Sequence, residues 1–464
     1  MNMMRSVLSV QGRVAEACVV AGAVLLTGCN DGTPNGTGAA DGTAGTVTIT
    51  DSASASATDG ATTGDSASAS ATAATTVSST AADSGSEAGE TAPPPVVFDV
   101  GVLPDVGVPP CEEGGGKGPE FSFLWASNSS QGTISKIDTQ TVTEVGRFIT
   151  RPDGAGDPSR TSVSQSGHVA VANRVGGVTK IYADISFCEE SNGTPGIQTS
   201  DDSTYLPWGE EECVAWHTPF NYESQRPVAW AQGTLDTTTC SYINERLWTA
   251  GRVGNNFDVL LLDGDTGVVV DQVAVVGLTN DFYGMYGGAV DGDGNFWAST
   301  LGSGNRLIRV DIDTMDYEIW NTPVGPHWYG MTVDDQNNVW LCSSDAARFD
   351  YATATFTQAT VGGWTGCMAE RGEDGLLWMA SGNSLVGVNR ETLAVDANWP
   401  VPGSYGVSID FYGYVWTVEN GNGAHRLDPS DGSVTSYNGL SGAYTYSDMT
   451  GYALTNAGGG VPSG

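Results

Sequence analysis

Short apolar segments alternate with turns rich in Asp, Gly and Asn from about residue 118 to the C-terminus. In one recurring segment an apolar residue is followed by Trp and then by small residues, and a second apolar segment ending in Asp or Asn comes next. Apolar runs of about four to eight residues between turn residues predict β-strands. The copies with Trp are Leu124–Ser127, Leu247–Ala250, Phe296–Ser299, Val339–Cys342, Leu377–Ala380 and Val415–Val418, and Val169–Ala172 takes the same place without Trp.

The copies recur at intervals of about 40 residues, with four short strands to a unit, which is typical of propeller blades. Seven copies therefore predict an all-β fold, a seven-bladed β-propeller over residues 118–456. The first unit has no lead strand, whereas an unassigned segment, 444–454, follows the last unit. We predict that this C-terminal strand completes blade one and closes the ring, which removes exposed sheet edges. Residues 457–464 are expected to be a disordered tail.

The strands resemble those of the virginiamycin B lyase (Vgb) group of streptogramin lyases. The resemblance covers about residues 120–454 and rests on three motifs, where Φ is apolar: Tyr-Gly-x-x-x-Asp in lead strands, Gly/Asn-Φ-Trp in the strands with Trp, and Arg-Φ-Asp in third strands. It implies a seven-bladed propeller. In that family a histidine with nearby glutamates and Mg²⁺ performs an elimination. Here only Glu419 follows a Trp strand at the family's glutamate position, and His327 is the best placed histidine.

The N-terminus has the features of an export signal. Arg5 and Arg13 precede an apolar run over residues 17–26, which is too short to span a bilayer. It ends in Leu-Thr-Gly-Cys29, which resembles the bacterial lipobox and implies a signal peptide over 1–28 and lipidation of Cys29. We therefore expect an exported protein with a lipid anchor in the cell envelope, at the outer membrane or cell surface.

Residues 29–117 consist almost wholly of Ser, Thr, Ala, Gly, Asp and Pro, and no Lys or Arg lies between Arg13 and Lys117. Such a segment buries too little apolar surface to offset its ordering entropy, so we predict a disordered tether. The chain carries 54 Asp and Glu against 18 Lys and Arg, a formal net charge of −36. That balance excludes nucleic acid as a partner, because phosphate binding needs a basic surface. We expect a monomer.

Six cysteines remain after Cys18 and Cys29, and an even number in an exported chain favours disulfides. Cys188 and Cys213 bracket an insertion in blade two, residues 185–213, so we predict that they pair. Cys342 and Cys367 lie in neighbouring blades and form the second predicted pair. Cys111 with Cys240 follows by elimination.

The insertion is rich in carboxylates, including Glu189 and Glu190, which with Asn192 are candidate oxygen ligands for Ca²⁺. A solvated acidic loop explains the same residues, and the spacing is not that of an EF-hand. No cofactor is indicated by the sequence itself; Ca²⁺ here, or Mg²⁺ through the family resemblance, are the two metals considered.

Ligands of propellers usually bind at the mouth of the central channel, near the starts of the inner strands. Aromatic faces and arginines there suit an anionic or aromatic small molecule or a glycan, whereas packing of the blade shoulders is the alternative explanation. The residues entering these strands are Arg160, Arg226, Tyr286, His327, Tyr329, Trp364, Tyr405 and Tyr446. The sequence thus predicts a propeller that binds a ligand or a protein, with an Mg²⁺-dependent lyase using His327 and Glu419 as the alternative.

Overall fold

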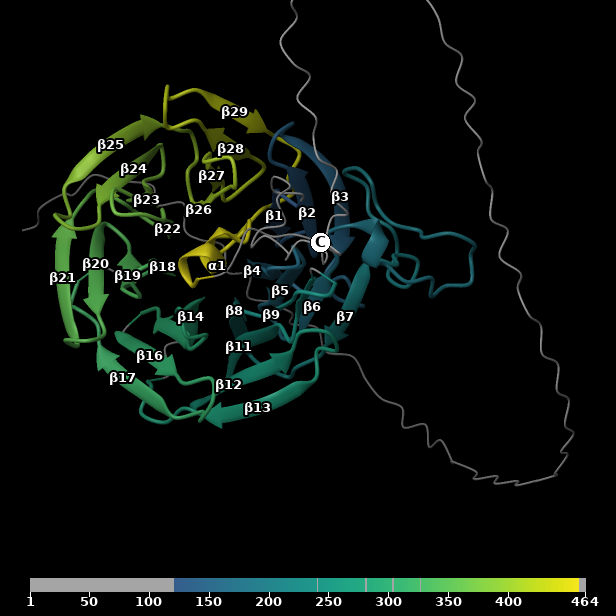
Figure 1. Cartoon of the computed structure of the whole chain (residues 1–464), viewed down its shortest axis with the longest axis horizontal. Helices are drawn as coiled ribbons and strands as arrows, with labels where there is room; N and C mark the ends of the chain where they lie inside the picture. The colour runs from purple at the N-terminus through teal and green to yellow at the C-terminus, as the bar shows by residue number, and fades with distance from the viewer. Residues whose placement is uncertain (1–120, 240, 280–281, 303, 326, 459–464) are drawn as a thin grey trace, which may run out of the picture. The chain divides into compact units, whose positions relative to one another are not determined.

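The computed structural model describes residues 121–239, 241–279, 282–302, 304–325 and 327–458. They form seven blades around a central channel, so the predicted all-β propeller is confirmed (Figure 1). In blades two to seven, four antiparallel strands run outward, and the first strand in the chain lies innermost. The predicted export signal, tether and Cys29 lie outside the described residues.

The strands of blades two to four follow the sequence units closely. Blade two contains β4 (Pro158–Val163), β5 (Val169–Asn173), β6 (Val178–Ile181) and β7 (Val214–Thr218); blade three contains β8 (Ser224–Ala231), β11 (Arg246–Val253), β12 (Asn256–Asp263) and β13 (Val269–Ala274); and blade four contains β14 (Met285–Val290), β15 (Phe296–Thr300), β16 (Arg306–Val310) and β17 (Tyr317–Asn321). A hairpin of β9 (Thr234–Asp236) and β10 (Ser241–Ile243), which the repeat does not predict, lies between β8 and β11 in the chain.

Blades five to seven have the shortest inner strands. They contain β18 (Gly330–Val333), β19 (Val339–Cys342), β20 (Asp345–Asp350) and β21 (Thr355–Thr360); β22 (Cys367–Ala369), β23 (Leu376–Ala380), β24 (Ser384–Asn389) and β25 (Val395–Pro400); and β26 (Gly406–Ile409), β27 (Val415–Val418), β28 (Ala424–Leu427) and β29 (Val434–Tyr437).

Blade one is built from both ends of the propeller. Its sheet contains β1 (Phe123–Asn128), β2 (Thr133–Asp138) and β3 (Thr143–Ile149). Residues 444–449, the closing segment, lie on the inner side of β1 and join it through two backbone hydrogen bonds, from Trp125 to Met449 at 2.8 Å and from Tyr444 to Ser127 at 3.0 Å. Ring closure by the C-terminus is therefore as predicted. The prediction of a strand over residues 444–454 is wrong, because residues 444–449 bond to β1 without forming a regular strand and Tyr452–Asn456 forms a short helix, α1.

Three of the repeat Trp residues are core residues whose indole groups are hydrogen-bonded to the turn before them. The Trp297, Trp340 and Trp416 side chains are at most 1% exposed. Their indole N–H groups donate to the carboxylates of Asp291, Asp334 and Asp410, at 2.9, 2.8 and 2.7 Å. Each of these carboxylates also accepts backbone N–H groups of its own turn, which orders the hairpin. In the Asp-Gly-Asp turn at 291–293, the carboxylate of Asp291 is therefore engaged in hydrogen bonds with other residues of the protein.

Glycine at the start of the inner strands allows neighbouring blades to approach closely. A Cβ at Gly330 would lie 2.5 Å from the Thr365 carbonyl oxygen, and one at Gly406 would lie 2.1 Å from the carbonyl oxygen of Thr445 in the closing segment. Because these distances exclude any side chain, the Tyr-Gly pairs of the lead strands reflect packing around the channel.

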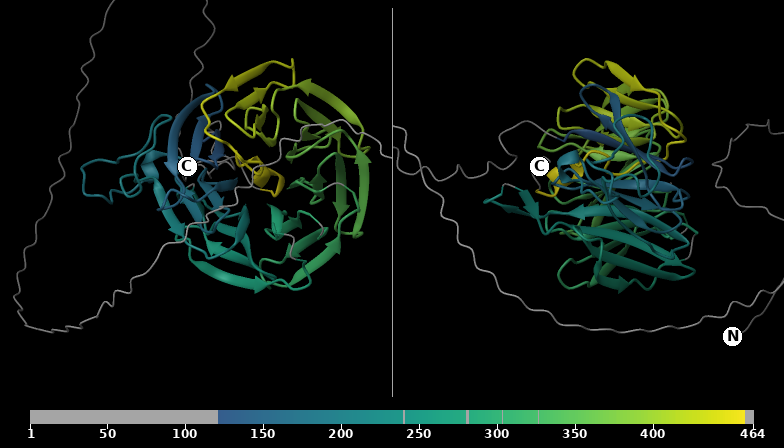
Figure 2. Two further views of the ribbon diagram at one scale, coloured as in Figure 1. Left: turned by 180° about the vertical axis from the view of Figure 1, so that it is seen from behind. Right: turned by 90° about the vertical axis from the view of Figure 1, so that its right-hand side faces the viewer.

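The C-terminal segment also fills the channel. Helix α1 lies in the middle of the ring (Figures 1 and 2), where Asn456 donates to the carbonyl oxygens of Val333 and Ala369, at the ends of β18 and β22. A cavity of about 20 Å³ remains beside Asp448, Met331 and other channel residues. That volume holds about one water molecule.

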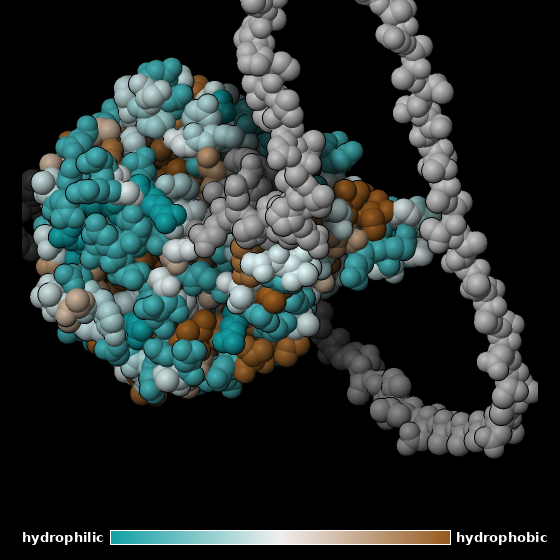
Figure 3. Space-filling model, in the orientation of Figure 1, coloured by the Kyte–Doolittle hydropathy of each residue, from teal (hydrophilic) through white to brown (hydrophobic). Residues whose placement is uncertain are grey.

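The surface seen in Figure 3 mixes hydrophilic and apolar residues over the blades. In the described part of the chain, no helix has the length and apolar character needed to cross a membrane.

Candidate functional site

Tyrosines gather at the end of the channel where the inner strands begin. Tyr286 belongs to β14, Tyr329 and Tyr405 directly precede β18 and β26, and Tyr444 and Tyr446 come from the closing segment. Their rings pack edge-to-face, tilted or stacked, with the centroids of Tyr329 and Tyr446 4.9 Å apart and those of Tyr286 and Tyr446 5.6 Å apart. Four parts of the chain that are far apart in sequence therefore form one aromatic cluster.

The hydroxyl groups of this cluster meet at Tyr444. Its oxygen lies 2.6 Å from the Tyr286 hydroxyl and 3.5 Å from the Tyr446 hydroxyl, and it is also in hydrogen-bond contact with the Tyr329 hydroxyl. The Tyr329 hydroxyl in turn contacts that of Tyr405. Tyr444 is half-buried, whereas Tyr286 and Tyr446 are buried, so Tyr444 is more accessible than those two.

Two buried arginines lie against these rings. Arg160, from β4, donates through Nε and Nη2 to the Tyr286 carbonyl oxygen at 3.0 and 2.9 Å, and its guanidinium stacks on the Tyr446 ring. Arg226, from β8, places Cζ 4.9 Å from the centroid of the Tyr286 ring. The two residues are only 1% and 5% exposed.

Neither arginine has a carboxylate partner among the described residues. Nη1 of Arg160 and Nη1 of Arg226 are both buried without a hydrogen-bond partner there. Buried guanidinium groups are normally paired, because an unpaired buried charge is costly. Two positive charges thus face a set of tyrosine hydroxyls in a protein whose formal net charge is −36.

The cluster changes the acidity of its members in opposite directions. Burial raises the pKa of Tyr286 and of Tyr446 well above the ordinary value. Burial also acts to raise the pKa of Tyr444, but the hydrogen bonds from Tyr286, Tyr329 and Tyr446 and the charge of Arg226 outweigh it and lower that pKa overall. Tyr444 is therefore the most readily ionised hydroxyl of the cluster.

Six of the eight residues predicted at the channel mouth come together in this cluster, and two lie outside it. Trp364 is 57% exposed and contacts only the edge, with its ring centroid 5.9 Å from that of Tyr405. His327 is exposed on the segment before β18. The six that converge are Arg160, Arg226, Tyr286, Tyr329, Tyr405 and Tyr446.

Sequence reasoning missed Tyr444 and Arg174, whose Cζ lies 4.8 Å from the centroid of the Tyr444 ring. Tyr444 could have been found, because it lies two positions before the candidate Tyr446 in a segment expected to be a strand, where such residues share a face. Arg174 follows β5 and forms an ion pair with Asp157, and no repeat feature distinguishes it.

Glu419, the other residue of the predicted lyase site, is bound to a different histidine. Its Oε1 lies 2.9 Å from Nε2 of His425 in β28. A Cβ at either Gly403 or Gly423 would lie 2.6 Å from the Glu419 side chain, so these glycines leave room for the carboxylate. Glu419 is thus held in place by its own blade, apart from any contact with His327.

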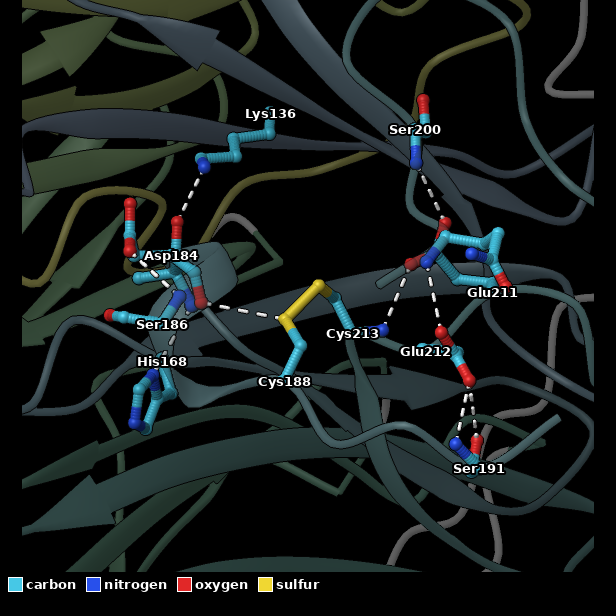
Figure 4. The surroundings of a disulfide bond; sticks show 12 residues. Lys136, His168, Asp184, Ser186, Cys188, Ser191, Ser200, Glu211, Glu212 and Cys213 are labelled. Atoms are coloured by element: carbon cyan, nitrogen blue, oxygen red, sulfur yellow. Dashed lines mark hydrogen bonds between the residues drawn. A yellow bond between two sulfur atoms is a disulfide. The ribbon is translucent and has the colours of Figure 1, made fainter. Parts of the chain in front are cut away.

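Hydrogen bonds among its own polar groups hold the insertion of blade two in place, as Figure 4 shows. The predicted Cys188–Cys213 disulfide is confirmed. The Glu212 carboxylate accepts backbone N–H groups of Ser191, Asn192 and Gln198 at 2.6–2.9 Å, and that of Glu211 accepts those of Ser200 and Cys213.

The carboxylates of the insertion therefore act mainly as acceptors for its own backbone. Of the candidate calcium ligands, Glu190 accepts the N–H of Gly193 and the Asn192 side chain accepts that of Thr194, while Glu189 is exposed. Among the described residues, no group of three or more His, Cys, Asp or Glu side chains is arranged to hold a metal ion.

The second predicted disulfide, Cys342–Cys367, is also confirmed. It connects β19 of blade five with β22 of blade six, and both cysteines are at most 2% exposed. The third predicted pair, Cys111 with Cys240, lies outside the described residues.

No family model matches the sequence, and no curated protein matches it either. Solved structures with low similarity include BamB from Moraxella catarrhalis, with 13% identity over 71% of this chain and 88% of that one, at a TM-score of 0.42. AztD from Citrobacter koseri has 11% identity over 70% and 96% of the two chains, at a TM-score of 0.45. The dihydro-heme d1 dehydrogenase NirN has 10% identity over 69% and 76%, at a TM-score of 0.42. Similarity this low says nothing about activity.

Proposed function

We propose that this protein is an exported lipoprotein, anchored to the cell envelope through Cys29, whose β-propeller binds a small ligand at the tyrosine end of its channel. The observation that carries the proposal is the convergence of Arg160, Arg226 and the tyrosine cluster on one end of the ring. A cluster of aromatic faces with two unpaired cations suits a ligand that has an aromatic ring or acidic oxygens.

The rest of the channel argues for this end as the binding site. At the opposite end of the inner strands, Asn456 of α1 is hydrogen-bonded to the last residues of β18 and β22. Trp364 stands 57% exposed beside Tyr405 and offers an open aromatic face at the edge of the cluster.

Thermal unfolding and calorimetric titration of the full-length protein test the binding role, with aromatic acids, simple carboxylates and neutral sugars as probes. A probe present at about 100 times its Kd raises the free energy of unfolding by about 2.7 kcal/mol. Trp364→Ala should weaken binding, whereas Tyr412→Ala, which removes a 40% exposed ring from a turn of blade seven, should not. If none of these probes binds the wild-type protein, the proposal is wrong.

The same titration separates binding from the lyase alternative. Affinity should survive His327→Ala, because His327 lies outside the cluster. Loss of turnover of a streptogramin on His327→Ala, or on chelation of Mg²⁺, would favour the enzyme instead.

The anchor has a separate test. Cys29→Ser should move the protein from the membrane fraction to the soluble fraction without changing ligand affinity. If the Cys29→Ser protein stays in the membrane fraction, lipid anchoring at Cys29 is wrong and the binding role is unaffected.

A further inference from the structure

We propose that Ser436, His425 and Glu419 form an esterase site on blade seven, with Ser436 as the nucleophile. The three residues come from the part of the ring that holds β27 to β29 (Figure 1): Glu419 directly follows β27, His425 lies in β28 and Ser436 lies in β29. None of them belongs to the tyrosine cluster, so the inference does not depend on the proposed ligand binding at the channel mouth.

The three side chains are joined through the imidazole ring. Nδ1 of His425 lies 2.8 Å from Oγ of Ser436, and Nε2 of His425 lies 2.9 Å from Oε1 of Glu419. A carboxylate only accepts hydrogen bonds, so Nε2 of the neutral ring carries the proton and Nδ1 is left to accept from the serine hydroxyl. Acyl-transfer enzymes of unrelated folds share this arrangement of nucleophile, base and orienting acid.

The strand register explains why the serine and the histidine meet. His425 and Ser436 are direct partners in the antiparallel pair β28–β29. The backbone N–H of Asp428 donates to Ser433, and hydrogen-bonded pairs alternate from there, so His425 and Ser436 form a non-hydrogen-bonded pair. In such a pair the side chains are closest, and the backbone N–H of Ser436 points away from β28 toward the open edge of the blade. That N–H is placed to donate to an oxyanion formed on a substrate at Ser436.

The turn between β27 and β28 positions the carboxylate. The backbone N–H of Glu419 donates to the Gly423 carbonyl oxygen at 2.9 Å, which brings the Glu419 side chain back over His425. His425 is only 3% exposed, whereas Ser436 is exposed. The base is therefore shielded from water, and the nucleophile is open to a substrate.

Blade seven departs from the repeat at this histidine. Thr417, which follows the repeat Trp416, pairs with His425. In blades three to six the residue in the same register position is buried and apolar, namely Leu260, Ile308, Ala347 and Val386. Packing of a blade is thus served by an apolar side chain at this position, and the polar set of blade seven points to a chemical role.

The reaction that this set supports is hydrolysis of a carboxylic ester. Oγ of Ser436 bonds to the carbonyl carbon while its proton passes to Nδ1 of His425, and the bond to the alcohol oxygen then breaks as that oxygen takes the proton. Water next loses a proton to His425 and attacks the acyl-serine, and Ser436 regains that proton as the carboxylic acid leaves. Ester and water become acid and alcohol, and Glu419 stabilises the imidazolium at each step.

Val434 indicates the acyl group. It lies two positions before Ser436 in β29, so the two side chains share a face, and Val434 is 36% exposed. An apolar surface beside the nucleophile suits a small apolar acyl chain. The substrate class is therefore an ester of a short-chain carboxylic acid.

Labelling of the full-length protein with phenylmethylsulfonyl fluoride, followed by peptide mass spectrometry, tests the nucleophile. The reagent forms an Oγ–S bond with an activated serine and releases fluoride. We expect the wild-type protein to carry the sulfonyl group on Ser436 and not on Ser433, an exposed serine directly before β29. Wild-type protein without the label on Ser436 would overturn the proposal, and this result needs no variant to fold.

Hydrolysis of 4-nitrophenyl butyrate tests the substrate class. Ser436→Ala, at an exposed position, should lower kcat/KM by about 100-fold or more, because it removes the group on which the base acts. Ser433→Ala is the matched control and should leave kcat/KM unchanged. Equal rates in wild type and Ser436→Ala would refute the esterase site. A label on Ser436 without hydrolysis of the ester would refute the substrate class and leave the nucleophile standing.

Glu419 acts through His425 and is a positioning residue, so its test separates orientation from binding. Glu419→Gln should lower kcat and leave KM unchanged, and Glu419→Asp, which keeps the carboxylate, should recover part of kcat. Equal losses in both variants, or a change in KM alone, would refute the orienting role of the carboxylate. Ligand affinity at the tyrosine cluster should be the same in Ser436→Ala and wild type, so failure of either proposal can be recognised separately.

Discussion

The backbone N–H of Trp125, in the first strand of the propeller, donates a 2.8 Å hydrogen bond to the carbonyl oxygen of Met449, near the end of the chain. Blade one therefore depends on residues that are more than three hundred positions apart. Without the closing segment, β1 presents an open edge and the channel loses its filling.

The closing segment should be required for the folded state. We expect a chain that ends at residue 443 to aggregate or to show no cooperative thermal unfolding, since it loses the inner part of blade one, the channel filling and α1 together. A chain ending at residue 458 is the control and should unfold as the full-length protein does. Soluble, cooperatively folded protein from the shorter chain would contradict this account of ring closure.

A substitution at Gly406 tests the contact between the closing segment and blade seven without removing any residue. Gly406→Ala places a Cβ 2.1 Å from the Thr445 carbonyl oxygen, so the closing segment must shift. We expect a loss of about 2–3 kcal/mol in the free energy of unfolding. A Cβ at Gly325 would lie 3.5 Å from the Gln358 side chain. Gly325→Ala should therefore lower the free energy of unfolding by less than about 1 kcal/mol. Urea denaturation of the two variants gives the comparison.

The Asp–Trp hydrogen bonds of blades four, five and seven should contribute to stability and not to binding. Asp334→Ala leaves the buried Trp340 indole N–H, at 2.8 Å in the wild type, without its acceptor and removes a partner of Arg390. Each unsatisfied group costs about 1–3 kcal/mol. Asp316→Ala, at an exposed position, is the control. A loss of ligand affinity in Asp334→Ala protein that is still folded would show a role beyond structure.

Asp448 should make stability depend on pH. Its side chain is buried in the channel, and burial raises its pKa from 3.8 to about 6, although backbone N–H groups of Val163 and Gly451 act in the opposite direction. The folded state therefore holds this proton more tightly than the unfolded state. The stability that Asp448 contributes is complete below pH 3.8 and is lost as the pH rises through about 6.

The variant Asp448→Asn removes this titration. At pH 8 it should raise the free energy of unfolding by up to about 3 kcal/mol relative to wild type, and below pH 4 the difference should vanish. Asp316→Asn, on the surface, should give a difference of less than about 0.5 kcal/mol at both pH values. A constant difference between wild type and Asp448→Asn at all pH values would contradict the titration of Asp448.

The two disulfides should differ in importance although each closes a loop with a sequence separation of 25 residues. Loop closure alone gives about 3 kcal/mol for either bond. Replacing Cys342 and Cys367 by Ala also disturbs two buried positions between blades five and six, so it should lower the Tm more than the same change at Cys188 and Cys213.

Limited proteolysis separates the two disulfides further. Loss of Cys188–Cys213 should expose the insertion to cleavage while the blades stay intact, because the insertion projects from blade two. Equal Tm losses in both double variants, with no new cleavage in the insertion, would contradict this difference.

The repeat itself determined the fold. Strand lengths, turns and the Trp spacing are local features, and a blade buries its core largely within one unit and against the next, so the sequence predicts seven blades and the origin of the closing strand. The same holds for the two disulfides, whose cysteines bracket local units. The hairpin β9–β10 follows no repeat feature, and α1 follows a strand-like pattern but packs as a helix against the inner strands β14, β18 and β22.

Only the tertiary structure decided what the channel mouth contains. The sequence indicates which tyrosines and arginines enter the inner strands, but ring closure is what brings Tyr444 from the C-terminus to Tyr286 of blade four and Arg226 of blade three. That neither Arg160 nor Arg226 has a carboxylate partner among the described residues is likewise a property of three-dimensional packing, since acidic residues are abundant along the chain. Charge pairing depends on distances across the ring, and those distances are set by the closed propeller and not by sequence spacing.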